Sequence, residues 1–392
     1  MPRLPMIRSR MRGRDIREDD RASTPLELLF DLTFVVAVAQ VAAQLAHAVS
    51  HGMTLVSILP FVMVFFAIWW AWINFTWFAS AFDTDDVPYR LLTMLQMGGV
   101  LVLAAGVPGA FTSSNFVTMT IGYVIMRVAM VAQWGRVIAQ DPASRPMAIR
   151  YVIGVASIQV LWVLRLLLPG ELGLASFFVL GVAEGLVPVF AEHRNLSPWH
   201  AGHIAERYGL FVIILLGECV SATTIAVQGI VSAHGVSANL LMVAISGLVL
   251  LFALWWLYFM GDTGERLRER RERSFIWAYG HYFVFASIAA IGAGIEVAVE
   301  RPASVPSVVI AYALAVPVAV FVIALISVNR YLGVTGACRP IPAIAAAILV
   351  LIVPAAAPAI GVPLTAALVA LVALVVAALV AVSLITERSP QS

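Results

Sequence analysis

The chain has 392 residues, of which 61% are hydrophobic and only 12% are charged, and its formal net charge is +2. Soluble globular proteins carry about twice this fraction of charged residues. The composition therefore excludes a soluble protein and indicates a polytopic integral membrane protein. The two cysteines, Cys219 and Cys338, are too few for a disulfide framework and lack the spacing of a metal site.

The chain begins with an arginine-rich segment, which predicts a basic cytoplasmic tail over residues 1–23. The segment resembles the basic start of a signal peptide. However, the apolar run that follows opens with Glu27 and Asp31, and a cleavable signal would not carry them. Positive charge beside a first span favours the cytoplasmic side. We therefore interpret the tail as a topology anchor rather than as an arm that binds nucleic acid.

Apolar runs of about 20 residues, the length that crosses a bilayer as a helix, follow one another along the chain. The runs lie at 25–50, 55–80, 88–108, 115–138, 148–168, 172–191, 203–226, 237–260, 275–298, 305–328, 341–360 and 362–385. With the N-terminus inside, nearly all loop arginines fall in internal loops, as the positive-inside rule requires. All basic residues are arginine, which suggests a GC-rich bacterial genome. The sequence thus predicts an all-α integral membrane protein of the bacterial inner membrane, with about twelve transmembrane helices and both termini cytoplasmic.

Two similar stretches suggest an internal repeat. Residues 61–86 and 246–266 each contain a phenylalanine before a pair of tryptophans, and then an acid–threonine step. This pattern predicts two parallel six-helix halves, 24–196 and 197–386, because an even number of helices per half preserves orientation. A cytoplasmic tail at 387–392 would follow. The alternative interpretation is that the tryptophan pairs are ordinary interfacial residues.

The predicted first span carries polar side chains on two faces. Glu27 and Asp31 are four residues apart and share one face, whereas Gln40 and Gln44 lie on roughly the opposite one. Such a helix is expected to contact other helices or water all round. We predict that Glu27 and Asp31 line a cytoplasmic vestibule. The two glutamines either line the same pathway or make hydrogen bonds between helices.

The predicted seventh span carries a row of polar residues along one face at about 100° per residue. These residues are His200, His203, Glu206, Arg207, Glu218, Ser221 and Thr224. A carboxylate at the bilayer centre costs at least about 2.5 kcal/mol, so Glu218 is expected to face protein or water rather than lipid. We predict that Glu218 carries a coupling proton. Glu206 and Arg207 are predicted to form an ion pair where the helix begins.

Other ionisable residues occur at membrane depth, namely Arg127, Arg165, Glu184, His281 and Glu296. Arg127 and Glu184 are predicted as charge partners, and His281 and Glu296 as members of the pathway for substrate or ions. Glu184 has a second interpretation, as an unpaired acid that titrates.

His200, His203 and Glu206 are weak candidates for a metal site, because the outer two are too far apart to bind one ion without another ligand. We therefore predict no metal and no cofactor. The chain contains no nucleotide-binding or hydrolase motif with supporting context. ATP-driven transport by this chain alone is therefore disfavoured.

Three long motifs resemble the low temperature requirement protein A family of bacterial membrane proteins. They are TPLELLFDLTFVVAVAQ, HIAERYGLFVIILLGECV and WAYGHYFVFASIAAIGAGIE, and the resemblance runs from about Thr24 to Arg330. It implies a multi-pass protein linked by name to growth in the cold. The positions carried over are Glu27, Phe30, Asp31, His203, Glu206, Arg207, Gly209, Glu218, Gly280, His281 and Glu296. Cys219 departs from the pattern, since a small hydroxyl or apolar residue is more usual there.

The leading functional hypothesis is a proton- or cation-coupled secondary transporter of an unidentified small solute, with a site formed by the first, seventh and ninth spans. His281 would relay protons or contact substrate. The alternatives are an ion channel, a membrane-embedded hydrolase that uses the His/Glu cluster, and a cold-stress membrane factor without transport; an enzyme is disfavoured. Expected partners are the lipid bilayer and the solute or ion, with no nucleic acid, and the sequence is compatible with an oligomer.

Overall fold

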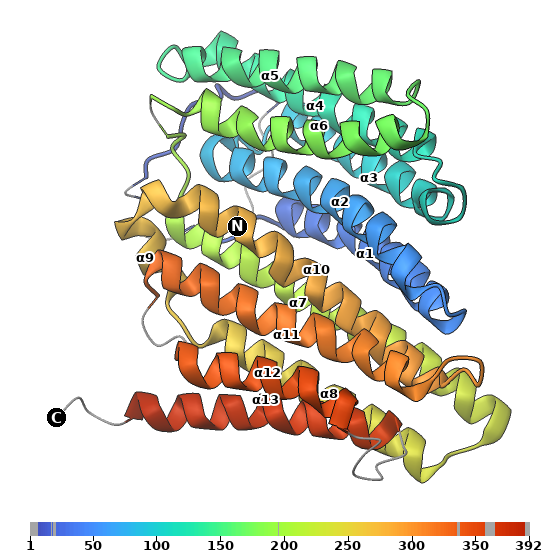
Figure 1. The fold of residues 1–392 in the computed structure, drawn as a ribbon. Helices are drawn as coiled ribbons and strands as arrows, with labels where there is room; N and C mark the ends of the chain where they lie inside the picture. Colours follow the sequence, from blue (N-terminus) through green and yellow to red (C-terminus); the bar gives the residue numbers. More distant parts are fainter. Residues whose placement is uncertain are drawn as a thin grey trace. The chain divides into compact units, whose positions relative to one another are not determined.

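The computed structural model describes residues 7–16, 18, 21–194, 196–334, 338–356 and 365–388, and all regular structure in this part of the chain is helical (Figure 1). The long helices are α1 (Pro25–Ser50), α2 (Thr54–Phe82), α3 (Val87–Ser113), α4 (Val117–Gln140), α5 (Arg145–Arg165), α6 (Gly170–Ala191), α7 (Ala201–His234), α8 (Ala238–Phe259), α10 (Ser274–Glu300), α11 (Ser307–Leu332), α12 (Pro340–Ala356) and α13 (Thr365–Arg388). A short helix, α9 (Thr263–Glu269), and a single turn, η1 (Arg271–Arg273), precede α10.

Each of the twelve predicted apolar runs coincides with one of these helices, which confirms the all-helical, multi-pass class. Ten helical segments within the described residues are long and apolar enough to cross a membrane. Pro340–Ala356 and the apolar part of α13 are shorter, so twelve spans, the repeat and the sidedness of the termini stay predictions. Residues 357–360 and 362–364 of the last two predicted runs, and 389–392 of the predicted C-terminal tail, lie outside the described residues.

The helix α1 begins with a reciprocal capping arrangement. The hydroxyl of Thr24 accepts a hydrogen bond from the Glu27 backbone N–H at 3.2 Å, and the Glu27 carboxylate accepts one from the Thr24 N–H at 2.7 Å. Pro25 occupies the first helical position, where its missing N–H costs nothing. This capping box fixes both the start of α1 and the position of the Glu27 carboxylate.

The chain separates into two compact units. Unit 1 comprises residues 1–37 and 63–207, and unit 2 comprises 38–62 and 208–392. In unit 1, α3 to α6 pack in chain order, each against the next. The closest of these contacts requires glycine, because a Cβ on Gly122 of α4 would lie 2.4 Å from the Leu103 nitrogen of α3.

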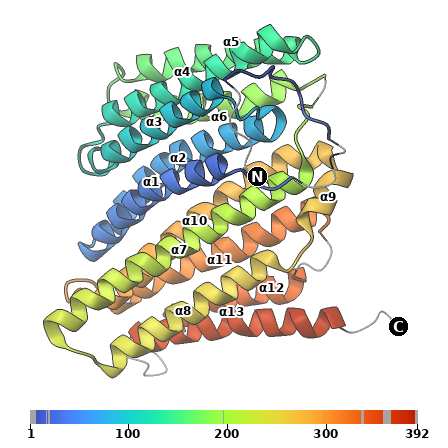
Figure 2. The ribbon, with the colours of Figure 1, turned by 180° about the vertical axis from the view of Figure 1, so that it is seen from behind.

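In unit 2, α11 packs against α10 and α12, and α13 packs against α8 and α12 (Figure 2). The helices α1, α2 and α7 contribute residues to both units. The buried side chains of this unit are mostly aliphatic, and Gly294 of α10 lies against Ala313 and Leu314 of α11.

The N-terminal segment packs on unit 1 rather than standing apart from it. The backbone N–H groups of Ser9 and Gly13 donate to carboxylate oxygens of Asp86 and Asp141, each at 3.0 Å. The Arg14 N–H donates to the Ala81 carbonyl at 3.0 Å. The segment predicted as a tail therefore forms part of the structure of this unit.

Candidate functional site

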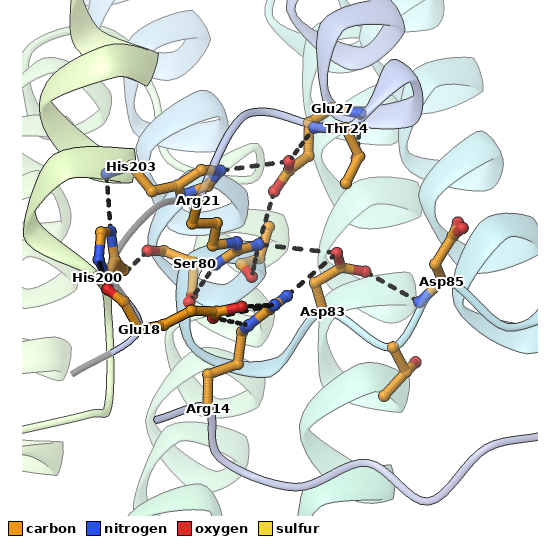
Figure 3. Close-up of polar contacts among 12 residues, drawn as sticks. Arg14, Glu18, Arg21, Thr24, Glu27, Ser80, Asp83, Asp85, His200 and His203 are labelled. Carbon is orange, nitrogen blue, oxygen red and sulfur yellow. Dashed lines mark hydrogen bonds and ion pairs between the residues drawn. The ribbon is translucent and has the colours of Figure 1, made fainter. Parts of the chain in front are cut away.

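Six ionisable side chains meet in the interior of unit 1, and we refer to them as the buried charge cluster. They are Arg21, Glu27, Asp31, Asp83, His203 and Arg207. They come from the segment before α1, from α1, from the α2–α3 loop and from the first two turns of α7; Figure 3 shows four of them. Charged side chains removed from water in this way require partners.

Glu27 lies at the centre of this cluster. One carboxylate oxygen lies 3.2 Å from the Arg21 guanidinium and 3.5 Å from that of Arg207. The other oxygen, which already accepts the Thr24 N–H, lies 3.3 Å from Nε2 of His203. One carboxylate therefore caps α1 and also ties it to the N-terminal segment and to α7.

Asp31 and Arg207 form the second pair of the cluster, and both are fully buried. Arg207 Nη2 donates to Asp31 Oδ1 at 2.5 Å, and the indole N–H of Trp72 donates to the same oxygen at 2.7 Å. Asp31 Oδ2 has no hydrogen-bond partner among the described residues. Arg207 Nη2 also lies 3.4 Å from the Thr76 hydroxyl. The pair therefore joins α7 to α1 and α2.

Arg21 connects the cluster to the end of α2 (Figure 3). Its guanidinium donates to the carbonyls of Ser80 and of Ala79, the latter at 2.8 Å, and lies 3.7 Å from Asp83. Burial and, next, the nearby charge of Glu27 raise the pKa of Asp83, and Arg21 partly opposes both effects, so that the pKa is about 6. Asp83 is thus an acid of this cluster, outside the predicted spans, whose pKa is raised by its surroundings.

His200 and His203 differ in their roles. Nε2 of His200 lies 2.8 Å from the Glu18 carbonyl, and its Nδ1 accepts the backbone N–H of His203 at 3.2 Å (Figure 3). Because a carbonyl only accepts, Nε2 carries the proton and both ring nitrogens of His200 are occupied. Nδ1 of His203 is buried without a hydrogen-bond partner within the described part of the chain.

The weak metal-site candidate does not assemble in this structure. Glu206 is exposed and accepts a hydrogen bond from the Ser23 N–H at 3.3 Å, whereas His203 is buried against Glu27. Across the described residues, no group of three or more His, Cys, Asp and Glu side chains is placed to hold a metal ion. The predicted pairing of Glu206 with Arg207 is also absent, because Arg207 pairs with the acids of α1.

A second buried ion pair in unit 1 joins Arg127 of α4 to Glu184 of α6 at 2.9 Å. Glu184 also accepts hydrogen bonds from the Tyr123 hydroxyl at 2.8 Å and from the Trp162 indole at 2.9 Å. Its two oxygens are therefore fully engaged, which corresponds to the predicted charge pair rather than to an unpaired acid. Arg165 donates to the Gly173 carbonyl at 2.9 Å.

Unit 2 contains two acids without such partners. Glu218 of α7 and Glu296 of α10 are both partly buried, and the negative charges of Glu300 and then of Glu218 act on Glu296. Neither has a hydrogen bond or an ion pair with any described residue. Beside them α7 and α10 are in close contact, since the Cys219 thiol lies 3.3 Å from the Ile288 carbonyl and a Cβ on Gly292 would meet Cys219 Sγ at 2.8 Å.

The remaining predicted pathway residues also lie in unit 2. Nδ1 of His281 lies 2.8 Å from the Trp277 carbonyl and therefore carries the proton, so Nε2 accepts the Tyr258 hydroxyl at 3.3 Å. His281 is thus a hydrogen-bonded member of a buried aromatic group. Gln40 is exposed and Gln44 is partly buried, and neither has a hydrogen bond to a described residue.

Sequence reasoning missed Arg21, Trp72, Thr76 and Asp83. Arg21 was assigned to a topology tail, and the other three carry no spacing that distinguishes them from ordinary helix-end residues. One available signal was the capping box of Thr24 and Glu27. It anchors the chain directly after Arg21 and so keeps this arginine close to the first acid.

The chain is similar to known proteins over most of its length. It matches the family described as bacterial low temperature requirement A protein over residues 22–382. It is also 26% identical over 303 residues to "Uncharacterized protein RA0937" of Rhizobium meliloti (strain 1021), covering 73% of this chain and 71% of that protein. No solved structure matches the chain.

Proposed function

The chain belongs to the bacterial low temperature requirement A family, and from this premise we propose that it is a proton- or cation-coupled secondary transporter of a small solute. The observation that carries the proposal is the pair of acids Glu218 and Glu296 in unit 2. Both are partly buried, and neither has an ion pair with an arginine among the described residues. The two acids are the proposed coupling residues.

The physical argument starts from the cost of charge inside an apolar bundle. A carboxylate at membrane depth costs at least about 2.5 kcal/mol when ionised, and a second carboxylate nearby increases that cost. A bound proton or cation removes both penalties. Occupancy of this site therefore changes the energy of the contact between α7 and α10, which is the property that an ion-coupled transporter needs.

The acids of unit 1 are less suited to this role. Asp31 forms an ion pair with Arg207, and Glu184 forms one with Arg127. Glu27 forms ion pairs with two arginines. A cation that bound at one of these carboxylates would have to displace the arginine that already compensates its charge. Glu27 and Asp31 would line a solute path only in a conformation in which these pairs have opened. We therefore assign the cluster to holding α1, α2 and α7 in position.

The first test is proton flux in proteoliposomes under an imposed pH gradient and membrane potential. Wild type would be compared with Glu218→Gln, Glu296→Gln and the control Glu171→Gln, since Glu171 is an exposed acid at the start of α6. Monodisperse elution of each variant establishes folding. We expect flux in wild type and in the control, and at least about a tenfold loss in the two coupling variants.

A screen of solutes by current recording on supported membranes would follow, with the same four proteins. A solute-dependent current that Glu218→Gln abolishes supports the proposed transporter. Proton flux in wild type that no solute in the screen changes would instead favour an ion channel. Solute-driven currents of equal size in wild type, Glu218→Gln and Glu296→Gln would overturn the proposed coupling site.

A further inference from the structure

An apolar groove runs along unit 2 between α10, α11 and α12. Its volume is about 770 Å³, and its lining is almost entirely hydrocarbon. The floor includes the small buried residues Ala319 and Ala347, whereas Phe283, Ile323 and Ile348 on the rim are exposed. Small residues between large ones create the groove. Its volume lies within the range of ordinary ligand sites.

The groove has the length and direction of a lipid chain. Its lining on α11 extends from Val316 to Tyr331, which corresponds to about 22 Å at 1.5 Å per residue. Half of the hydrocarbon core of a bilayer is about 15 Å thick. The groove can therefore hold an extended acyl chain from one leaflet, parallel to the helices.

Positive charge is concentrated at one end of the groove, where Tyr331 lies. The Arg273 guanidinium lies 5.5 Å from the centre of the Tyr331 ring, and its Nη1 donates to the Tyr331 carbonyl at 2.6 Å. The neighbouring Arg330 is exposed and has no ion pair with a described residue. The nearest acid to Arg273 is the exposed Glu272, 3.9 Å away.

A third arginine is fixed at the same end by the backbone. Arg270 Nη1 donates to the Leu332 carbonyl at 3.0 Å and occupies the space beside Gly333. Gly333 has a positive φ of 80°, and a Cβ there would lie 2.1 Å from Arg270 Nη1. Residues 262–273 contain five arginines against four acids, and Arg330 adds to this excess. The positive charge at this end of the groove thus favours an anion, and the apolar lining along the groove favours a hydrocarbon chain.

We propose that this groove binds an anionic phospholipid, with one acyl chain between α10, α11 and α12 and the phosphate at Arg273 and Arg330. The assignment follows from the two properties of the site together. An apolar wall alone would accept any lipid. Guanidinium groups at one end favour a phosphate with net negative charge over a zwitterionic headgroup, because each basic residue near a membrane surface adds an independent attraction.

Binding of defined lipids to the purified full-length protein tests this assignment. Phosphatidylglycerol and phosphatidylcholine with identical acyl chains would be titrated in detergent, and bound lipid counted by native mass spectrometry. We expect phosphatidylglycerol to bind more tightly, and Arg273→Gln or Arg330→Gln to weaken it about fivefold each without changing phosphatidylcholine binding. The matched control is Arg268→Gln, an exposed arginine of α9 that, unlike Arg273, has no contact with the groove residue Tyr331 among the described residues.

A second measurement locates the acyl chain without relying on a loss of binding. A fluorophore on Ser327→Cys, a groove residue, would be compared with one on Ile153→Cys, an exposed residue of α5, both in a Cys338→Ser background. Brominated phosphatidylglycerol should quench the fluorophore at the groove position more strongly than brominated phosphatidylcholine does. At the α5 position, the two brominated lipids should quench the fluorophore to the same extent.

Three results would overturn the proposal. The first is equal affinity of wild type for the two lipids. The second is unchanged phosphatidylglycerol binding in the double variant Arg273→Gln/Arg330→Gln. The third is a dimer in solution that protects the Ser327→Cys position from every brominated lipid, which would assign the groove to a second copy of the chain.

Discussion

The acids of the two units differ in whether an arginine compensates their charge. In unit 1, Glu27 and Asp31 are fully buried, yet each has an arginine within 3.5 Å. In unit 2, Glu218 and Glu296 are only partly buried, and neither has an ion pair with an arginine among the described residues. Depth of burial alone therefore does not distinguish the acids of the two units. The presence of an arginine partner does.

This contrast has an energetic consequence. Removing one member of a buried ion pair leaves the other charge without compensation, which is strongly destabilising. Removing the charge of an acid that has no partner relieves a cost instead. The buried charge cluster should therefore determine the stability of unit 1, whereas the acids of unit 2 should be replaceable without loss of stability.

The largest effect is expected from Arg207→Gln. Both Glu27 and Asp31 would lose a buried partner, and the loss of stability should be about 3–5 kcal/mol. Thermal unfolding in detergent measures the change, and Arg268→Gln, an exposed arginine, should stay within about 0.5 kcal/mol of wild type. Adding Asp31→Asn to Arg207→Gln should recover part of the loss. An unchanged melting temperature in the single variant would contradict the role assigned to this arginine.

A pH-dependent effect is expected at Asp83. Its pKa is about 6 in the folded protein against an ordinary value of 3.8, so the folded state holds this proton more tightly than the unfolded state. Stability should therefore fall as pH rises from about 4 to about 6, by up to roughly 3 kcal/mol from this group.

Unfolding of Asp83→Asn across that pH range provides the measurement. The variant should lose this part of the pH dependence and should be more stable than wild type above about pH 6. Asp85→Asn, two residues away and half-exposed, should keep the wild-type profile. The assignment to Asp83 would be wrong if both variants followed the same curve.

A smaller effect is expected from Thr24→Ala. The substitution removes the hydroxyl that caps α1 and frees the Glu27 N–H, at a cost of about 1 kcal/mol. Thr24→Ser, which keeps the hydroxyl, is the matched control and should retain most of the stability. If alanine and serine gave identical melting temperatures, the capping box would contribute nothing to the cluster.

The smallest effect on stability is expected from Glu218→Gln and Glu296→Gln. Each removes a charge without leaving a partner behind, so the melting temperature should be unchanged or slightly raised, within about 0.5 kcal/mol. The same variants should show the loss of flux described above. A drop as large as that of Arg207→Gln would show that these acids are structural and would remove the contrast between the units.

The sequence by itself determined where the helices lie and which class of protein they form. A run of about 20 apolar residues can satisfy its backbone in a bilayer only as a helix, so the prediction does not depend on neighbouring segments. The motifs around Glu27, His203 and His281 likewise indicated the family. Four of the six members of the buried charge cluster were also named from the sequence.

Only the tertiary structure decided which charges pair. Arg207 was predicted to pair with the adjacent Glu206, but adjacent residues on a helix point about 100° apart. Its actual partner, Asp31, is 176 positions away in the sequence. Arg21 was assigned to a tail, yet it reaches the carbonyls at the end of α2. Hydrophobicity is a property of each segment, whereas the compensation of a buried charge depends on which segments the fold brings together.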